Sequence, residues 1–95
     1  RTTSAAWEKD MPTQLGVNSR VEGRGRDRQI VVALEGGIEG KVMVEIYNSA
    51  GELVKIEEGR GVELRIGAGN LSSGMYTVMV RNGRRIANSR VVALN

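Results

Sequence analysis

The sequence predicts an all-β, immunoglobulin-like antiparallel β-sandwich of about seven strands. Three observations support this fold class. Apolar and polar residues alternate with a period of two over most of the chain after residue 28, as in half-buried strands. Turn signals rich in Gly, Asn and Ser separate these stretches about every 8–12 residues. The apolar residues are mainly Val, Ile, Leu and Met, and the β-branched members of this set favour pleated strands.

The first strands follow from local patterns. Residues 30–34 form a continuous apolar run before two glycines, which predicts a central strand buried on both faces. Residues 41–47 alternate, so that Val42, Val44 and Ile46 share one face. A turn over residues 48–51 follows, with Gly51 where a left-handed backbone is needed, and residues 52–57 return as a strand. The span 41–57 is therefore predicted to be a hairpin.

The remaining elements follow the same logic. Residues 58–61 are predicted to be a turn, and Val62, Leu64 and Ile66 then alternate with charged residues in a half-exposed strand. A Gly-, Asn- and Ser-rich connection spans residues 67–74. Residues 75–81 alternate with Tyr76, Val78 and Val80 inward. Asn82-Gly83 predicts a type I′ hairpin turn, and a last strand covers about residues 85–94.

Composition divides the chain into two parts. Residues 1–28 lack sustained periodicity, and the charged, glycine-interrupted stretch 20–28 is predicted to be loop. We interpret 1–28 as a linker or the tail of a preceding domain that can also contribute an edge strand, and 29–95 as the immunoglobulin-like domain. The chain starts at Arg1, without an apolar signal-peptide core or a long apolar run. It is therefore expected to be a piece of a longer precursor, without a membrane-spanning segment.

Charge is distributed unevenly along the chain. The net charge is +3, yet five arginines and no acidic residue follow Glu63. A solvated basic face explains this pattern, and so does a docking edge for an acidic partner, formed by Arg81, Arg84, Arg85 and Arg90. Nucleic acid is not expected as the partner, because no aromatic residue stands among these arginines to stack on bases.

Catalytic chemistry is not expected. The chain contains no His and no Cys, so the common base–nucleophile pairs and zinc ligand sets cannot form. Glu57 and Glu58 are adjacent, and neighbours on a strand point to opposite faces, so they are not expected to converge on one substrate. We therefore predict no enzyme activity, no cofactor and no metal site.

Tyr76 stands at the entry of a predicted strand, after a turn-forming segment. This position is typical of a tyrosine corner, in which the ring fills the core and the hydroxyl binds nearby backbone. A plain core aromatic at a corner explains the same pattern, so the residues alone leave both interpretations open.

Three stretches resemble a known family, the C-terminal sorting domains of the type IX (Por) secretion system of Bacteroidetes-type bacteria. Residues 44–54 resemble its V-x-I-Y-x-x-x-G-x-x-V hairpin, residues 71–78 its L-x-x-G-x-Y-x-V motif, and residues 90–94 its terminal basic residue and apolar strand. The resemblance implies these motif residues: Gly51, Leu71, Gly74, Tyr76, Val78, Arg90, Val91 and Val92.

The resemblance implies a function as an export signal. Such a domain directs its cargo through the periplasm and across the outer membrane, to the cell surface or the extracellular space. Its partners would be the type IX machinery and a cell-surface sortase that commonly removes the domain and attaches the cargo. The exposed terminal strand could also pair with another copy or a partner. The alternative is a generic immunoglobulin-like accessory or docking module of a secreted enzyme or adhesin.

Overall fold

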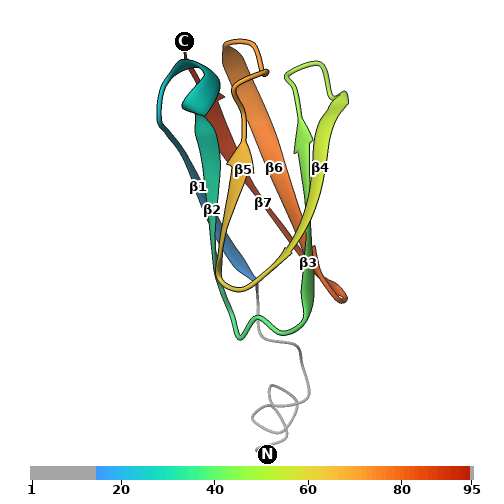
Figure 1. Ribbon diagram of the computed structural model, residues 1–95. Helices are drawn as coiled ribbons and strands as arrows, with labels where there is room; N and C mark the ends of the chain where they lie inside the picture. The colour runs from blue at the N-terminus through green and yellow to red at the C-terminus, as the bar shows by residue number, and fades with distance from the viewer. Residues whose placement is uncertain (1–14, 95) are drawn as a thin grey trace, which may run out of the picture.

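The computed structural model describes residues 15–94, which form two antiparallel sheets packed face to face (Figure 1). One short 3₁₀ turn, Gly25–Asp27, precedes the second strand. The strands of this part of the chain are β1 Gly16–Glu22, β2 Gln29–Glu35, β3 Lys41–Tyr47, β4 Leu53–Arg60, β5 Glu63–Gly67, β6 Gly74–Asn82 and β7 Arg85–Ala93. The predicted all-β sandwich of about seven strands is confirmed.

The strand order is β1-β2-β5 in one sheet and β4-β3-β6-β7 in the other. Three hairpins, β1–β2, β3–β4 and β6–β7, lie within the sheets. The chain crosses from one sheet to the other after β2, after β4 and after β5. The second and fifth strands are thus neighbours in one sheet and the third and sixth in the other, as in immunoglobulin-like sandwiches.

The core lies between the sheets and is built mainly from β-branched side chains. The predicted inward residues of β3 and β6 are all buried, which confirms both alternations. Across the sandwich they meet the inward residues of β2 and β5. The residues that make up this centre are Ile30, Val32, Leu34, Val42, Val44, Ile46, Ile66, Tyr76, Val78 and Val80.

Strand β2 is buried on both faces, as its apolar run predicts. Val31 points away from the core, yet it is fully buried between Arg20 of β1 and Arg65 of β5, its neighbours in register. These arginines bind the carboxylates of Glu22 and Glu63, both within their own strands and across the sheet, at N–O distances of 2.7–3.6 Å. The aliphatic parts of the two arginine side chains therefore cover Val31 while their charged ends face water.

The loop predicted over residues 20–28 is wrong for Arg20–Glu22, which belong to β1. This strand lies at the edge of the three-stranded sheet and pairs with β2 along its whole length. Its inner face carries a polar residue, Ser19, whose Oγ lies 2.7 Å from the Oγ of Ser89 in β7. Because the outer face carries charges and the inner face carries a serine, the alternation of apolar and polar residues is too weak to predict this strand. Residues 1–14 of the predicted linker lie outside the described residues.

The turn predicted over residues 58–61 is also wrong, because β4 continues to Arg60. The chain turns at Gly61 and Val62 instead, and Val62 is exposed rather than part of an inward face. Gly59 serves packing here, since a Cβ at this position would lie 2.6 Å from Cδ2 of Leu64. The glycine that suggests a turn in the sequence allows β5 to approach β4.

The last hairpin forms where it is predicted, but with a different turn. Asn82 and Arg85 are paired, so the loop consists of Gly83 and Arg84. Gly83 has φ 65°, and no other residue type among those described has a positive φ. This geometry fits a type II′ turn rather than the predicted type I′. Asn82 stays in the strand because its buried Nδ2 donates to the carbonyls of Glu39 and Lys41, at 2.7 and 3.0 Å.

The ion pairs over Val31 predict a pH dependence. Hydrogen bonds from Arg65, and then from Arg20, hold the pKa of Glu22 below its usual value near 4.5. A carboxyl with a lowered folded-state pKa stabilises the fold above its unfolded pKa, and loses this effect as the pH falls through the folded value. We expect Glu22→Gln to lower the free energy of unfolding at neutral pH, by a margin that vanishes in acid.

Urea unfolding of both proteins along a pH series measures this margin. Glu39→Gln is the matched control, because Glu39 is exposed and has no ion pair within residues 15–94. A margin that grows toward acid pH would contradict the proposed effect of Glu22.

Candidate functional site

Several segments that are distant in sequence meet at one end of the sandwich (Figure 1). The 3₁₀ turn, the β3–β4 turn at residues 48–51, the β5–β6 connection at 68–73 and the end of β7 all lie there. This end therefore brings together the three stretches that carry the family resemblance.

A buried arginine joins these segments. Arg28, which is 1% exposed, precedes β2. Its Nε and Nη2 donate to the carbonyl of Ala68, at 3.2 and 3.0 Å, and Nη2 also donates to the carbonyl of Leu71. Its Nη1 donates to the carbonyl of Leu94, at 2.9 Å. One guanidinium thus binds the start of β2, the β5–β6 connection and the end of the terminal strand together.

Close backbone packing supports the same junction. The backbone N–H of Ala68 donates to the carbonyl of Arg28, at 2.8 Å. At Gly69 a Cβ would lie 2.4 Å from the carbonyl oxygen of Arg26, so a side chain at this position would collide with backbone. The connection can lie against the 3₁₀ turn because residue 69 is glycine.

Tyr76 forms a tyrosine corner. Its ring is buried in the core near the start of β6, and its hydroxyl donates to the carbonyl of Ser72, at 2.6 Å. This bond fixes the end of the β5–β6 connection to the strand that follows. The corner geometry supports the first of the two interpretations left open by the sequence.

The β3–β4 turn is held by Asn48. Its Oδ1 accepts the backbone N–H groups of Ala50 and Glu52, at 3.0 and 2.9 Å. Gly51 has φ 85°, which confirms the predicted left-handed backbone. The turn therefore has a defined shape at the margin of the four-stranded sheet.

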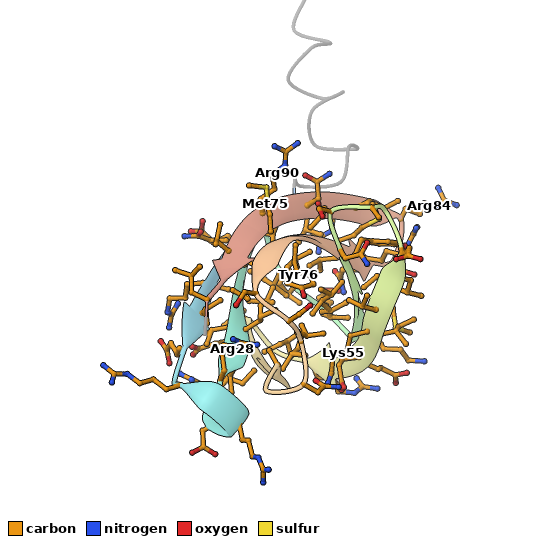
Figure 2. All side chains as sticks on the ribbon, turned by 90° about the horizontal axis from the view of Figure 1, so that it is seen from above. Arg28, Lys55, Met75, Tyr76, Arg84 and Arg90 are labelled. Atoms are coloured by element: carbon orange, nitrogen blue, oxygen red, sulfur yellow. The ribbon has the colours of Figure 1, made fainter. Side chains whose placement is uncertain are left out.

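Beside this turn, the outer face of the four-stranded sheet carries a shallow hollow of about 510 Å³. A row of cross-strand neighbours runs through it: Tyr47 of β3, Thr77 of β6 and Arg90 of β7. Figure 2 shows Arg90 and Met75 on this outer side, while Tyr76 points between the sheets. The lining residues are Tyr47, Asn48, Ser49, Gly51, Met75, Thr77, Met79 and Arg90.

The charge of the hollow comes from Arg90. This side chain is exposed, and no ion pair within the described residues involves it. The nearby carboxylate of Glu45 accepts the hydroxyl of Tyr47, at 3.2 Å, and Nε of Arg81, at 3.4 Å. Burial, and then this hydrogen bond to Glu45, raise the pKa of Tyr47, which keeps the phenol neutral. The hollow thus combines apolar walls with a single arginine at its margin.

The predicted motif residues separate into two groups. Leu71, Tyr76, Val78 and Val91 are buried and serve the core. The others lie at the surface or at a strand end. Gly51 and Arg90 line the hollow, Val92 is half-exposed opposite Met75 in register, and Gly74 begins β6.

The structure does not bring the four predicted arginines together on one free edge. Arg81 is paired with Glu45. Arg85 points inward and donates to the carbonyls of Gly36 and Gly37 and to Oδ1 of Asn82, so it ties the β2–β3 loop to the last hairpin. Arg84 and Arg90 are exposed, but they lie well apart (Figure 2).

Several residues of this site are not singled out by the sequence. The role of Arg28 has no local signal, because its partners lie 40 to 66 positions away. Tyr47, Met75 and Met79 alternate with inward residues, which does predict an outward side chain. Their position side by side on one face of the sheet depends on the pairing of β3 with β6, and the local pattern does not predict this pairing.

No group of three or more Asp or Glu side chains in residues 15–94 is arranged to hold a metal ion. In the same part of the chain, no helix has the length and apolar character needed to cross a membrane.

The model of the family described as "Secretion system C-terminal sorting domain" matches residues 27–93, from the 3₁₀ turn to the end of β7. A search of curated proteins gave no match.

The Arg28 junction predicts a large stability effect. Arg28→Met keeps much of the aliphatic side chain but removes the guanidinium donor from the carbonyls of Leu71 and Leu94, and it leaves the carbonyl of Ala68 with the backbone N–H of Leu71 alone. Because each such loss costs about 1–3 kcal/mol, we expect the free energy of unfolding to fall by about 3 kcal/mol or more. Urea denaturation measures the change, and Arg24→Met, at an exposed neighbouring position, should change it little. Equal effects of the two substitutions would contradict the role of Arg28.

The tyrosine corner predicts a smaller effect. Tyr76→Phe retains the ring and removes the hydroxyl that binds Ser72, so we expect a loss of about 1 kcal/mol. Tyr47→Phe is the control, because its hydroxyl binds Glu45 on the half-buried outer face. Thermal and urea unfolding should rank Tyr76→Phe as the more damaging change, and the reverse order would refute the corner's contribution.

Proposed function

The chain belongs to the family of secretion system C-terminal sorting domains, and from this premise we propose that the hollow beside the β3–β4 turn is its contact with the export machinery. As a member of this family, it is a type IX sorting signal. It directs the protein that carries it across the outer membrane, to the cell surface or the extracellular space. A sorting-signal domain of this kind is not catalytic.

The observation that carries the proposal is the convergence of the family motifs on one surface. The turn after β3 provides Asn48, Ser49 and Gly51, the L-x-x-G-x-Y-x-V stretch provides Met75 and Thr77, and the terminal stretch provides Arg90. Some side chains of these stretches pack in the core, and the outward ones jointly line one open surface, which supports a shared role in binding.

The chemistry of the hollow defines the partner surface. Methionine side chains adapt to varied apolar partners, and an arginine at the margin favours a carboxylate. No acidic residue follows Glu63 in the sequence, and the nearby Glu45 already binds Arg81 and Tyr47. We expect a machinery surface that places an acidic group beside apolar residues.

The remaining parts of the export route belong to the same proposal. The folded domain would be recognised in the periplasm, and a cell-surface sortase would then remove it. The domain would include more than residues 29–95, because β1 completes the three-stranded sheet and Arg28 joins three segments. No feature of the described residues favours a generic accessory module.

Charge reversal at the hollow tests the contact. A reporter fused to residues 1–95 is expressed in a bacterium that has this secretion system. We expect Arg90→Glu to reduce the exported fraction about tenfold, which corresponds to a lost interaction of about 1.4 kcal/mol. Arg84→Glu makes the same change of charge at an exposed turn remote from the hollow, and it should leave export unchanged. The exported and retained fractions of the reporter are compared by immunoblotting.

Two further measurements separate the outcomes. Urea unfolding checks that both variants are as stable as the native domain. A reporter without residues 74–95, which lacks β6 and β7, should remain inside the cell. If the truncated reporter is retained but Arg90→Glu is exported normally, the hollow is not the contact. If the truncated reporter is exported, the domain is not the signal.

A further inference from the structure

Strand β4 is an edge strand with three exposed apolar side chains in its first half. It pairs with β3 on one side, and its other side has no partner strand within residues 15–94. Figure 1 shows β4 and β5 joined at one end and separating along their length, so this edge is open. Leu53, Val54 and Ile56 are 49%, 39% and 52% exposed. Natural proteins usually protect such an edge, since its free backbone groups can pair with another chain.

Two charges flank the centre of this edge. Lys55 and Glu57 lie opposite the inward residues Ile46 and Val44 of β3, so they share one face, while Ile56 lies opposite Glu45 on the other. Neither Lys55 nor Glu57 has an ion pair or a side-chain hydrogen bond among the described residues. They are separated by one residue and carry opposite charges.

We propose that β4 pairs in antiparallel fashion with β4 of a second copy of this chain, around a two-fold axis through Ile56. In this register Ile56 meets Ile56 of the second copy. Lys55 lies opposite Glu57 of the second copy, and the symmetry repeats the same pair on the other side of the axis. The two four-stranded sheets then form one continuous sheet.

The charges select this register among its neighbours. Centring the axis on residue 55 would place Lys55 against itself, and centring it on residue 57 would place Glu57 against itself. Like charges directly opposite each other destabilise a strand pair, whereas opposite charges stabilise it. The segment is thus complementary to itself at the position where its exposed isoleucine also meets its own copy.

A second copy fits this edge better than the terminal strand does. Strand β7, the other edge of the sheet, has β1 packed beside it, with Ser19 and Ser89 in contact. It also carries arginines and no acidic residue, so it offers no self-complementary pair. The hollow that contains Arg90 is lined by residues of β3, β6, β7 and the β3–β4 turn and by no residue of β4, so the two surfaces can be tested separately.

Cross-linking tests the axis directly. The chain has no cysteine, so Ile56→Cys introduces a single thiol. Residues opposite each other in an antiparallel pair have Cα atoms about 4.5–5.5 Å apart, which suits a disulfide. We expect mild oxidation of the full chain to yield a covalent dimer. Ile86→Cys is the control, because Ile86 is equally exposed but lies on β7. Equal cross-linking of the two variants would overturn the proposal.

Charge exchange tests the register. Sedimentation velocity over a concentration series gives the dimer dissociation constant of the native chain. We expect Lys55→Glu and Glu57→Lys each to weaken dimerisation about tenfold or more, since each places like charges opposite one another twice. The double variant carries the pair in exchanged order and should recover dimerisation. A native chain that stays monomeric throughout, or a double variant no better than the single ones, would refute the proposal.

Discussion

The guanidinium of Arg28 is the interaction on which the arrangement of this molecule depends. Taking a charged group out of water costs several kcal/mol, so a buried arginine persists only where its donors are well used. Here it donates to the carbonyls of Ala68, Leu71 and Leu94, in segments that the hairpins alone would not hold together. These segments include the end of the terminal strand and the connection before the tyrosine corner. With them fixed, β6 and β7 start and finish at a defined end of the sandwich, and the hollow on their outer face has a fixed shape.

The two outer faces of the sandwich differ in how far their apolar side chains are exposed to water. On the three-stranded sheet, arginines form ion pairs with glutamates within and between strands and cover Val31, so that face presents paired charges to water. On the four-stranded sheet, Met75, Ile56, Ile86 and Val92 are about half exposed. A monomeric protein seldom leaves apolar groups gathered without purpose on one side. The distribution supports the two proposals, which place both binding surfaces on the four-stranded sheet.

The inward faces of β2, β3 and β6 can be predicted from the sequence, because apolar residues occur there at every second position and these are the residues that form the core. The ends and edges follow less well. Strand β1 and the last residues of β4 are rich in charges, so a local pattern assigns them to loops. They are strands because the main chain of β1 pairs with β2 and that of β4 pairs with β3. Arg85 resembles a surface charge in the sequence, and its partners in the β2–β3 loop become visible only in the folded chain. Of the candidate site, Gly51 and Arg90 are predictable from motif spacing. The role of Arg28 depends on carbonyls in distant segments. The proximity of Tyr47 to Met79 depends on the pairing of β3 with β6. No local signal predicts either.

The burial of half of the motif residues changes what the family pattern means for recognition. A partner cannot touch Leu71, Tyr76 or Val78 while the domain is folded, since these side chains form part of the core. If they contribute to export, they do so by stabilising the fold. They fix the positions of the β5–β6 connection and of β6, and so the shape of the hollow on the outer face. Arg90, by contrast, is exposed on that surface and contributes little to packing. Loss of export after a change at Tyr76 would report on folding, whereas loss after a change at Arg90 in a stable domain would report on contact. Under the proposed function, the sorting signal is a folded surface, and the buried half of the motif residues holds this surface in place.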